Sequence, residues 1–207
     1  DVVLPEGLLY LNDGAFSHCS YLSSITIPST VNVIGYNAFE DCVRLKVATL
    51  AEGILTIDDN AFRNCTMLET ITLPSSLMYL EEYAFQNCEA LKAIAIPDKV
   101  KVIESYAFSG CYSLKTVKLP NNLLTIGQRA FESCNALVSL ELPESLKYIS
   151  NYAFLGCTSL ESVNLPSILY ELGESAFNNC DSLEEVVLPD NLTSLYSTFS
   201  GGDNLKS

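Results

Sequence analysis

The residues most able to take part in chemistry are eight cysteines, which recur every 23 residues from Cys19 to Cys180. Thiols at a fixed spacing can form disulfides, bind a metal or pack in a core. Equivalent side chains in stacked repeats point the same way instead of toward one another, which disfavours disulfides. A thiolate metal site needs Cys-x-x-Cys pairs or histidine partners, and His18 is the only histidine. We therefore expect a ladder of buried, reduced thiols formed by Cys19, Cys42, Cys65, Cys88, Cys111, Cys134, Cys157 and Cys180.

Three carboxylates form a second regular set. Asp58, Glu81 and Glu104 are separated by the same interval as the cysteines, so they occupy one position in three successive units. Carboxylates stacked at strand spacing repel one another, so either their pKa values rise or a cation lies among them. The sequence leaves two interpretations open, a weak Ca²⁺ site and a solvated acidic stripe.

A third set gathers positive charge in a chain whose formal net charge is −14. Lys92 and Lys115 share one position in neighbouring units, and Lys118 lies on the next outward position. Such a group could hold an anionic partner by charge-assisted hydrogen bonds. The alternative is that flanking glutamates neutralise the lysines and leave them solvated. The predicted binding surface consists of Lys92, Lys115, Lys118, Thr72, Ala95, Glu69 and Glu141.

None of these sets predicts catalysis. A nucleophile needs a general base beside it, and one histidine next to a structural cysteine does not supply that arrangement. Carboxylate pairs are expected by chance in a chain with 25 aspartates and glutamates. We therefore predict that the protein is not an enzyme and uses no cofactor.

The elements that position these side chains follow the same period, which is 23 positions long. Proline recurs at this spacing from Pro5 to Pro189, with Ala51 in the one gap, and leucine, isoleucine or valine recur at fixed offsets. A constant period in this range is the signature of a leucine-rich-repeat solenoid. Eight complete coils cover residues 5–188 and a partial coil covers 189–207, so that 1–207 form one domain. The predicted core ladder of aromatic rings is Phe16, Phe39, Phe62, Phe85, Phe108, Phe131, Phe154 and Phe177, with Phe199 one residue early.

Each coil should contain three segments. Residues such as 25–27 and 117–119 alternate apolar and polar and precede a proline, which predicts a short strand in one parallel sheet along the solenoid. The Ala-Phe-x-x-Cys-x-x-Leu segment spaces its apolar groups by three, which predicts a 3₁₀ or helical corner. A second, weaker strand is expected at 31–34 and 100–103 on the opposite face. Gly201 and Gly202 follow Phe199, so the last coil is expected to be frayed.

Charge and hydropathy narrow the possible partners. A pI near 4.3 disfavours nucleic acid and anionic membrane surfaces, which need clustered lysine and arginine. A membrane-spanning segment needs an apolar run of about 18 residues. No run in this chain approaches that length, so this segment should not insert into a membrane. The chain starts and ends within a repeat, and we expect it to be a fragment of a longer protein.

The repeat resembles the BspA-like, or Treponema pallidum-type, leucine-rich repeats over nearly the whole chain. The motif departs from the common leucine-rich form because proline follows the last strand leucine directly and cysteine stands before the strand. The resemblance implies a right-handed solenoid on a secreted or cell-surface protein that acts in adhesion. It transfers no catalytic residue.

These observations predict a non-enzymatic binding module at the cell surface that recognises a macromolecule through the sheet face. The expected partner is a protein of a host or neighbouring cell, with a glycan as the alternative, and the expected state is a monomer. Two competing hypotheses remain: a structural spacer that projects another domain, and an accessory repeat domain of a larger surface protein or enzyme.

Overall fold

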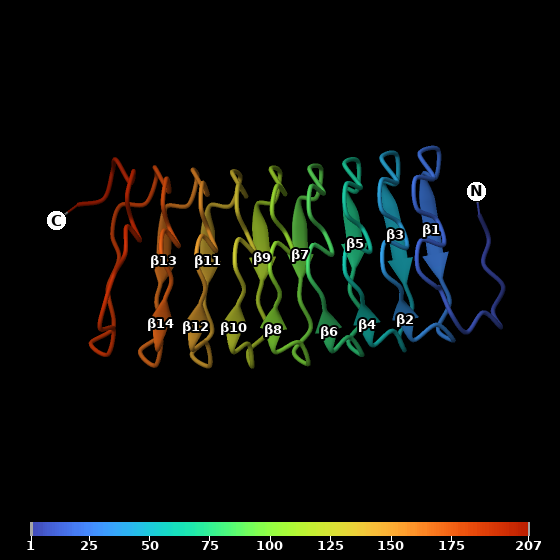
Figure 1. Cartoon of the computed structure of the whole chain (residues 1–207), viewed down its shortest axis with the longest axis horizontal. Helices are drawn as coiled ribbons and strands as arrows, with labels where there is room; N and C mark the ends of the chain where they lie inside the picture. The colour runs from blue at the N-terminus through green and yellow to red at the C-terminus, as the bar shows by residue number, and fades with distance from the viewer. Residues whose placement is uncertain (1, 207) are drawn as a thin grey trace.

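The structure, a computed structural model that describes residues 2–206, is an elongated stack of coils with the two termini at opposite ends (Figure 1). Most coils contribute two strands, and the described residues contain no helix. The predicted domain limits, Asp1 and Ser207, lie outside the described residues. The longer strands are β1 (Ser24–Ile27), β3 (Val47–Leu50), β5 (Thr70–Thr72), β7 (Ala93–Ala95), β9 (Thr116–Lys118), β11 (Ser139–Glu141) and β13 (Ser162–Asn164). The two-residue strands are β2 (Val33–Ile34), β4 (Thr56–Ile57), β6 (Tyr79–Leu80), β8 (Val102–Ile103), β10 (Thr125–Ile126), β12 (Tyr148–Ile149) and β14 (Glu171–Leu172).

All strand pairs are parallel, and each residue pairs with its counterpart one repeat period away. Thr26, for example, lies beside Thr49, and Thr49 beside Thr72. The longer strands form one face, which we call the sheet face, and the two-residue strands form a second face (Figure 1). The sheet face was predicted as one continuous sheet, but it is divided into the segments β1-β3-β5, β7-β9 and β11-β13. Strands β5 and β7, and likewise β9 and β11, are neighbours without a strand ladder between them.

The phenylalanines form the predicted ladder. Neighbouring ring centroids are 5.0–5.7 Å apart and the ring planes lie within 9° of parallel, from Phe16 to Phe199. The rings from Phe39 to Phe177 are fully buried, whereas the two end rings are only partly buried. Burying such a ring stabilises the fold by about 1.5–3 kcal/mol. The core is therefore a column that runs through the whole stack.

The cysteines form a second ladder with one exception to the prediction. Cys42 and its six successors are buried, but Cys19 is exposed because no described coil covers it on the N-terminal side. All eight are free thiols, and each buried Sγ donates a hydrogen bond of 3.1–3.4 Å to a phenylalanine carbonyl oxygen of the preceding coil. Burial raises the pKa of Cys111 to about 12, which leaves the thiol protonated and unreactive. Each buried cysteine is therefore a hydrogen-bond donor as well as a small side chain of the core.

The corners are turns, and the prediction of 3₁₀ or helical corners is wrong. Asn60 and Asn64 have φ values of 58°, in the left-handed region, so a right-handed helix cannot continue through either residue. Some backbone N–H groups of a corner donate to the next coil, and others donate within the same turn. The amide of Phe62 bonds to the carbonyl of Ala84 in the next coil (2.8 Å), whereas that of Cys65 bonds within its own turn to Phe62 (3.2 Å). Each corner is thereby tied to its neighbour as well as to itself.

The last coil is the most open, as predicted. Within the described residues no strand follows β14, and the side chains of Leu195 and Tyr196 are 43% and 66% exposed. Phe199 follows Phe177 by one residue less than the repeat period, yet its ring still stacks on that of Phe177, with the centroids 5.7 Å apart. The missing residue therefore does not disturb the stacking of the rings. The core ladder thus extends beyond the last strand.

Candidate functional site

The sheet face presents the predicted binding surface to solvent. Thr72 of β5, Ala95 of β7 and Lys118 of β9 are all exposed, because alternate residues of each strand point away from the core. Their rows along the stack consist mostly of small or charged side chains, so the described strands offer no aromatic platform on this face. The other predicted members are exposed or half-buried on the same side of the coils: Lys92, Lys115, Glu141 and Glu69.

One of the three lysines is paired with an acid. Nζ of Lys92 lies 3.1 Å from Oε2 of Glu69 in the preceding coil, and the two side chains are 64% and 43% exposed. An exposed pair of this kind contributes little to stability, about 0–1 kcal/mol. Lys115 and Lys118 make no ion pair with any described residue. The predicted neutralisation by glutamate therefore applies to one lysine of the group.

A shallow groove of about 480 Å³ crosses the sheet face between β9 and β11. It lies where the sheet is divided, and it is lined by Thr116, Lys118 and Glu141 among others. Val117 is only partly buried at this point, whereas its counterpart Ile94 in β7 is buried. A hollow thus lies at this division beside two predicted binding residues, Lys118 and Glu141, a feature that the repeat pattern does not reveal.

The carboxylate stripe runs along another edge of the coils. The pKa of Glu81 is raised, first by burial and then by the charge of Glu104 and of neighbouring aspartates, and the pKa of Glu104 is raised by burial and by Glu82. Oδ1 of Asp58 accepts the backbone N–H of Asp59 at 2.8 Å, which turns one oxygen toward the chain itself. Nearby negative charge thus adds to burial in raising the pKa of Glu81 and of Glu104, and the Ca²⁺ site stays a prediction.

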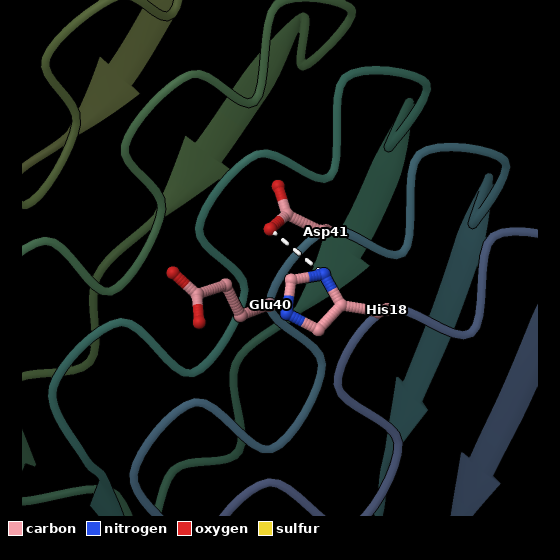
Figure 2. Close-up of side chains that lie close together, drawn as sticks. All are labelled: His18, Glu40 and Asp41. Carbon is pink, nitrogen blue, oxygen red and sulfur yellow. Dashed lines mark ion pairs between the residues drawn. The ribbon is translucent and has the colours of Figure 1, made fainter.

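A different group brings metal-ligating side chains together at the N-terminal corners. His18, Glu40 and Asp41 each place one ligand atom within 4.8 Å of the others, the one group of three or more in residues 2–206 that does so (Figure 2). Nδ1 of His18 lies 3.1 Å from Oδ2 of Asp41. We call this group the corner cluster. The sequence contained a signal for it, because Asp41 follows His18 by one repeat period.

The corner cluster continues into a ladder of amides. Nδ2 of Asn64 donates to Oδ1 of Asp41 at 2.8 Å, and Nδ2 of Asn87 donates to Oδ1 of Asn64 at 2.9 Å. His18, Asp41, Asn64 and Asn87 occupy the same position in four successive coils, and their φ values lie between 57° and 59°. The ladder ends at Gly110, where a Cβ would collide with Oδ1 of Asn87. We call the row from His18 to Asn87 the polar ladder.

Each corner has a second position with a left-handed backbone, and in four successive coils Tyr83, Tyr106, Arg129 and Tyr152 fill it and form an aromatic column. Tyr83 and Tyr106 stack with centroids 4.8 Å apart, and the guanidinium of Arg129 lies 4.6 Å from the ring of Tyr152. Arg129 is also paired with Glu132 at 2.6 Å. The faces of Tyr83 and Tyr106 are turned toward each other, and the guanidinium of Arg129 lies over the ring of Tyr152, so neighbouring side chains cover these ring faces.

Exposed apolar side chains gather on the second face. Met78 and Tyr79 are 41% and 54% exposed, and with Val102 they line a groove of about 260 Å³ between β6 and β8. Further along, Tyr148 and Tyr170 meet edge to face at 5.8 Å. The prediction placed binding on the sheet face alone and did not foresee this surface.

No helix in residues 2–206 is able to cross a bilayer.

The chain is similar to known repeat proteins over nearly its whole length. The family model "BspA type Leucine rich repeat region" matches residues 1–106 and 79–206 with six copies. A leucine-rich repeat protein from Bacteroides ovatus is 32% identical, with a TM-score of 0.85, and the match covers 96% of this chain and 58% of that protein. This chain therefore spans little more than half of that relative's length.

Two further solved structures agree. The T. pallidum leucine rich repeat protein is 30% identical with a TM-score of 0.73, and the match covers 89% of this chain and 78% of that one. A leucine rich cell surface protein from Faecalibacterium prausnitzii is 25% identical with a TM-score of 0.57, covering 95% and 75% of the two chains. No curated protein sequence shows significant similarity. Because the repeat model spans nearly all residues and two solved relatives reach 30% identity or more, this chain belongs to the BspA-type leucine-rich-repeat proteins.

Proposed function

We propose that the protein is a non-enzymatic adhesion module that acts at a cell surface or after secretion and binds a protein of a host or neighbouring cell. Leucine-rich-repeat proteins of this type typically serve as interaction modules and are typically surface-exposed or secreted, which supports the proposal. Solenoids suit this role because their repeats present an extended surface that many contacts can share.

The observation that carries the proposal is the position of the lysines relative to the groove on the sheet face. Lys118 lines the groove between β9 and β11, and Lys115 stands in the same coil without an ion pair to any described residue. In a chain with a formal charge of −14, these side chains are a local positive exception. A carboxylate-bearing segment would gain charge-assisted hydrogen bonds there.

The pair between Lys92 and Glu69 is compatible with this role. Both side chains reach solvent, so exchanging the Glu69 carboxylate for one from a partner costs little. A protein partner is favoured over a glycan because the described strands of the sheet face carry small and charged side chains instead of aromatic rings on which a sugar could stack. The Lys92, Lys115 and Lys118 group is therefore the proposed centre of recognition.

The experiment compares two triple variants that change the formal charge equally. K92E/K115E/K118E reverses the proposed site, and K99E/K101E/K147E reverses three exposed lysines that lie away from the sheet face. Labelled proteins are incubated with host epithelial cells, and bound protein is counted by flow cytometry. The proposal predicts that the first variant loses at least about tenfold in binding, as expected when several charge-assisted contacts are lost, and that the second stays near wild type.

Three outcomes would contradict the proposal. Equal losses would show that net charge alone governs attachment. Binding that survives the sheet-face reversal but fails in the control variant would move the site to the second face. If neither the wild type nor the variants bind cells, the spacer or accessory-domain interpretation replaces the adhesion proposal.

A further inference from the structure

The corner cluster has the composition of a transition-metal site. One imidazole and two carboxylates supply one nitrogen and two oxygen ligands, all within 4.8 Å of one another. Imidazole favours Zn²⁺ and its neighbours in the first transition row, whereas Ca²⁺ takes oxygen ligands only. The cluster is thus chemically distinct from the carboxylate stripe of Asp58, Glu81 and Glu104.

We infer that His18, Glu40 and Asp41 form a surface site for a divalent transition-metal ion, Zn²⁺ in particular, in which water fills the remaining coordination positions. The ligands come from two neighbouring coils, with His18 on the first corner and both carboxylates on the next (Figure 2). A bound ion would therefore link the two N-terminal corners of the solenoid. The site is independent of the proposed adhesion surface.

The backbone fixes the positions from which these ligands project. The N–H of His18 bonds to the carbonyl oxygen of Glu40 at 2.7 Å, which holds the two corners against each other. His18 and Asp41 both have φ values near 58°, so their side chains leave the corner in the same direction, one coil apart. The N–H of Asp41 is itself bonded to the carbonyl of Arg63 at 2.9 Å. The arrangement is held by the stacking of coils and needs no rearrangement of the chain.

Neighbouring side chains orient both carboxylates, as outer-shell groups do in metal sites. Oε1 of Glu40 is paired with the guanidinium of Arg63 at 3.3 Å, and Oδ1 of Asp41 accepts the amide of Asn64 at 2.8 Å. Oδ2 of Asp41 then faces Nδ1 of His18 at 3.1 Å, and Oε2 of Glu40 makes no hydrogen bond or ion pair with a described residue. Arg63 also lowers the negative charge of the cluster, so removing that guanidinium should strengthen cation binding.

The polar ladder offers a competing explanation that the test must separate from metal binding. His18 can simply donate an N–H to Asp41 as the first member of a row of hydrogen-bonded side chains. The row itself provides matched substitutions. Asn64 and Asn87 occupy the same left-handed register, so Asn at positions 18 and 41 preserves the backbone and the ladder while removing the metal ligand.

The experiment uses the single histidine of the chain as its reporter. Zn²⁺ is titrated into ¹⁵N-labelled protein, and the two ring nitrogens and the ring C–H signals of His18 are followed by NMR, with calorimetry for affinity. The background is Cys19→Ser, so that the adjacent exposed thiol cannot supply a ligand. The expected result is a saturable shift of the His18 ring signals at one equivalent of Zn²⁺.

The variants then decide between the two explanations. Asp41→Asn, Glu40→Gln and His18→Asn should each lower Zn²⁺ affinity by about tenfold or more, while Arg63→Gln should raise it. Glu81→Gln, in the carboxylate stripe, should leave it unchanged. Ring signals that do not move at millimolar Zn²⁺, affinity that is indifferent to Asp41→Asn and Glu40→Gln, or loss of binding in Glu81→Gln would each overturn the site. Thermal unfolding without metal checks that every variant is folded.

Discussion

The thiol of Cys111 donates a hydrogen bond to the carbonyl oxygen of Phe85 in the preceding coil, 3.3 Å away. The same oxygen also accepts the backbone N–H of Cys88 at 3.2 Å. One carbonyl thus closes its own turn and ties the next coil to it. Because this arrangement repeats from Cys42 to Cys180, the cysteine ladder joins the coils by side-chain hydrogen bonds as well as by packing.

Replacing Cys111 by Ala should cost about 1–2 kcal/mol of unfolding free energy, from the lost hydrogen bond and the small void left in the core. Cys19→Ala is the matched control, because Cys19 is exposed and should change stability by less than about 0.5 kcal/mol. Urea denaturation of both variants measures the difference. Equal losses would show that the ladder bond and the burial of the thiol contribute nothing.

In the native protein one cysteine should react with a thiol reagent and the seven buried cysteines should not. Burial raises the pKa of Cys42 and Cys180 to about 12, so these protonated thiols resist modification at neutral pH. Ellman's reagent should titrate one thiol, Cys19, in the native protein and eight after denaturation without reductant. Several rapidly reactive thiols in the native state, or fewer than eight in the denatured state, would contradict the reduced, buried ladder.

The phenylalanine column should be stronger in its middle than at its C-terminal end. Phe108 is fully buried between Phe85 and Phe131, and Phe108→Ala should cost about 3–5 kcal/mol. Phe199 has one ring neighbour among the described residues and lies in a coil without strands, so Phe199→Ala should cost much less. Chemical denaturation compares the two variants, and similar losses would mean that the last coil is packed as tightly as the middle.

The carboxylate stripe should weaken the fold at neutral pH. The pKa of Glu81 is raised in the folded state, so the native protein holds the proton more tightly than the unfolded chain does. Stability therefore falls as pH rises from about 4.5, the ordinary value, through the raised folded value. Glu81→Gln should stabilise the protein by about 0.5 kcal/mol at pH 7 and have little effect in acid, below the ordinary value.

Thermal unfolding with Ca²⁺ and with EDTA separates the two interpretations of the stripe. For a solvated stripe, Glu81→Gln raises the melting temperature in both conditions. A Ca²⁺ site would give the opposite sign, because Ca²⁺ would stabilise the wild type and the substitution would remove that gain.

The repeat period made the core predictable from the sequence. Phe108 and Cys111 have counterparts in nearly every coil, and a residue that recurs at a fixed offset has to meet its own copies when the coils stack. The turn geometry was not predictable in the same way. Spacing by three fits a helix as well as a turn, and only the left-handed conformation of residues such as Asn60 and Asn64 separates the two.

Functional features were harder to predict because they depend on departures from the repeat. The corner cluster combines His18 with Asp41 at the same register but also with Glu40 at the neighbouring one, which a search for identical columns misses. The groove at Lys118 arises where β9 and β11 lose their ladder, although both strands match the pattern. The pairing of Lys92 with Glu69, by contrast, follows directly from the period.

The most direct measurement of the central claim, binding through the sheet face, is a lysine footprint of the cell-bound protein. Protein attached to host cells and protein free in solution are acetylated briefly, and modification at each lysine is quantified by mass spectrometry. Lys92, Lys115 and Lys118 are exposed in the free protein and should be protected severalfold in the bound state, while Lys99, Lys101 and Lys147 should react equally in both. Protection confined to Lys99, Lys101 and Lys147, or no protection at any lysine of a bound protein, would contradict the account.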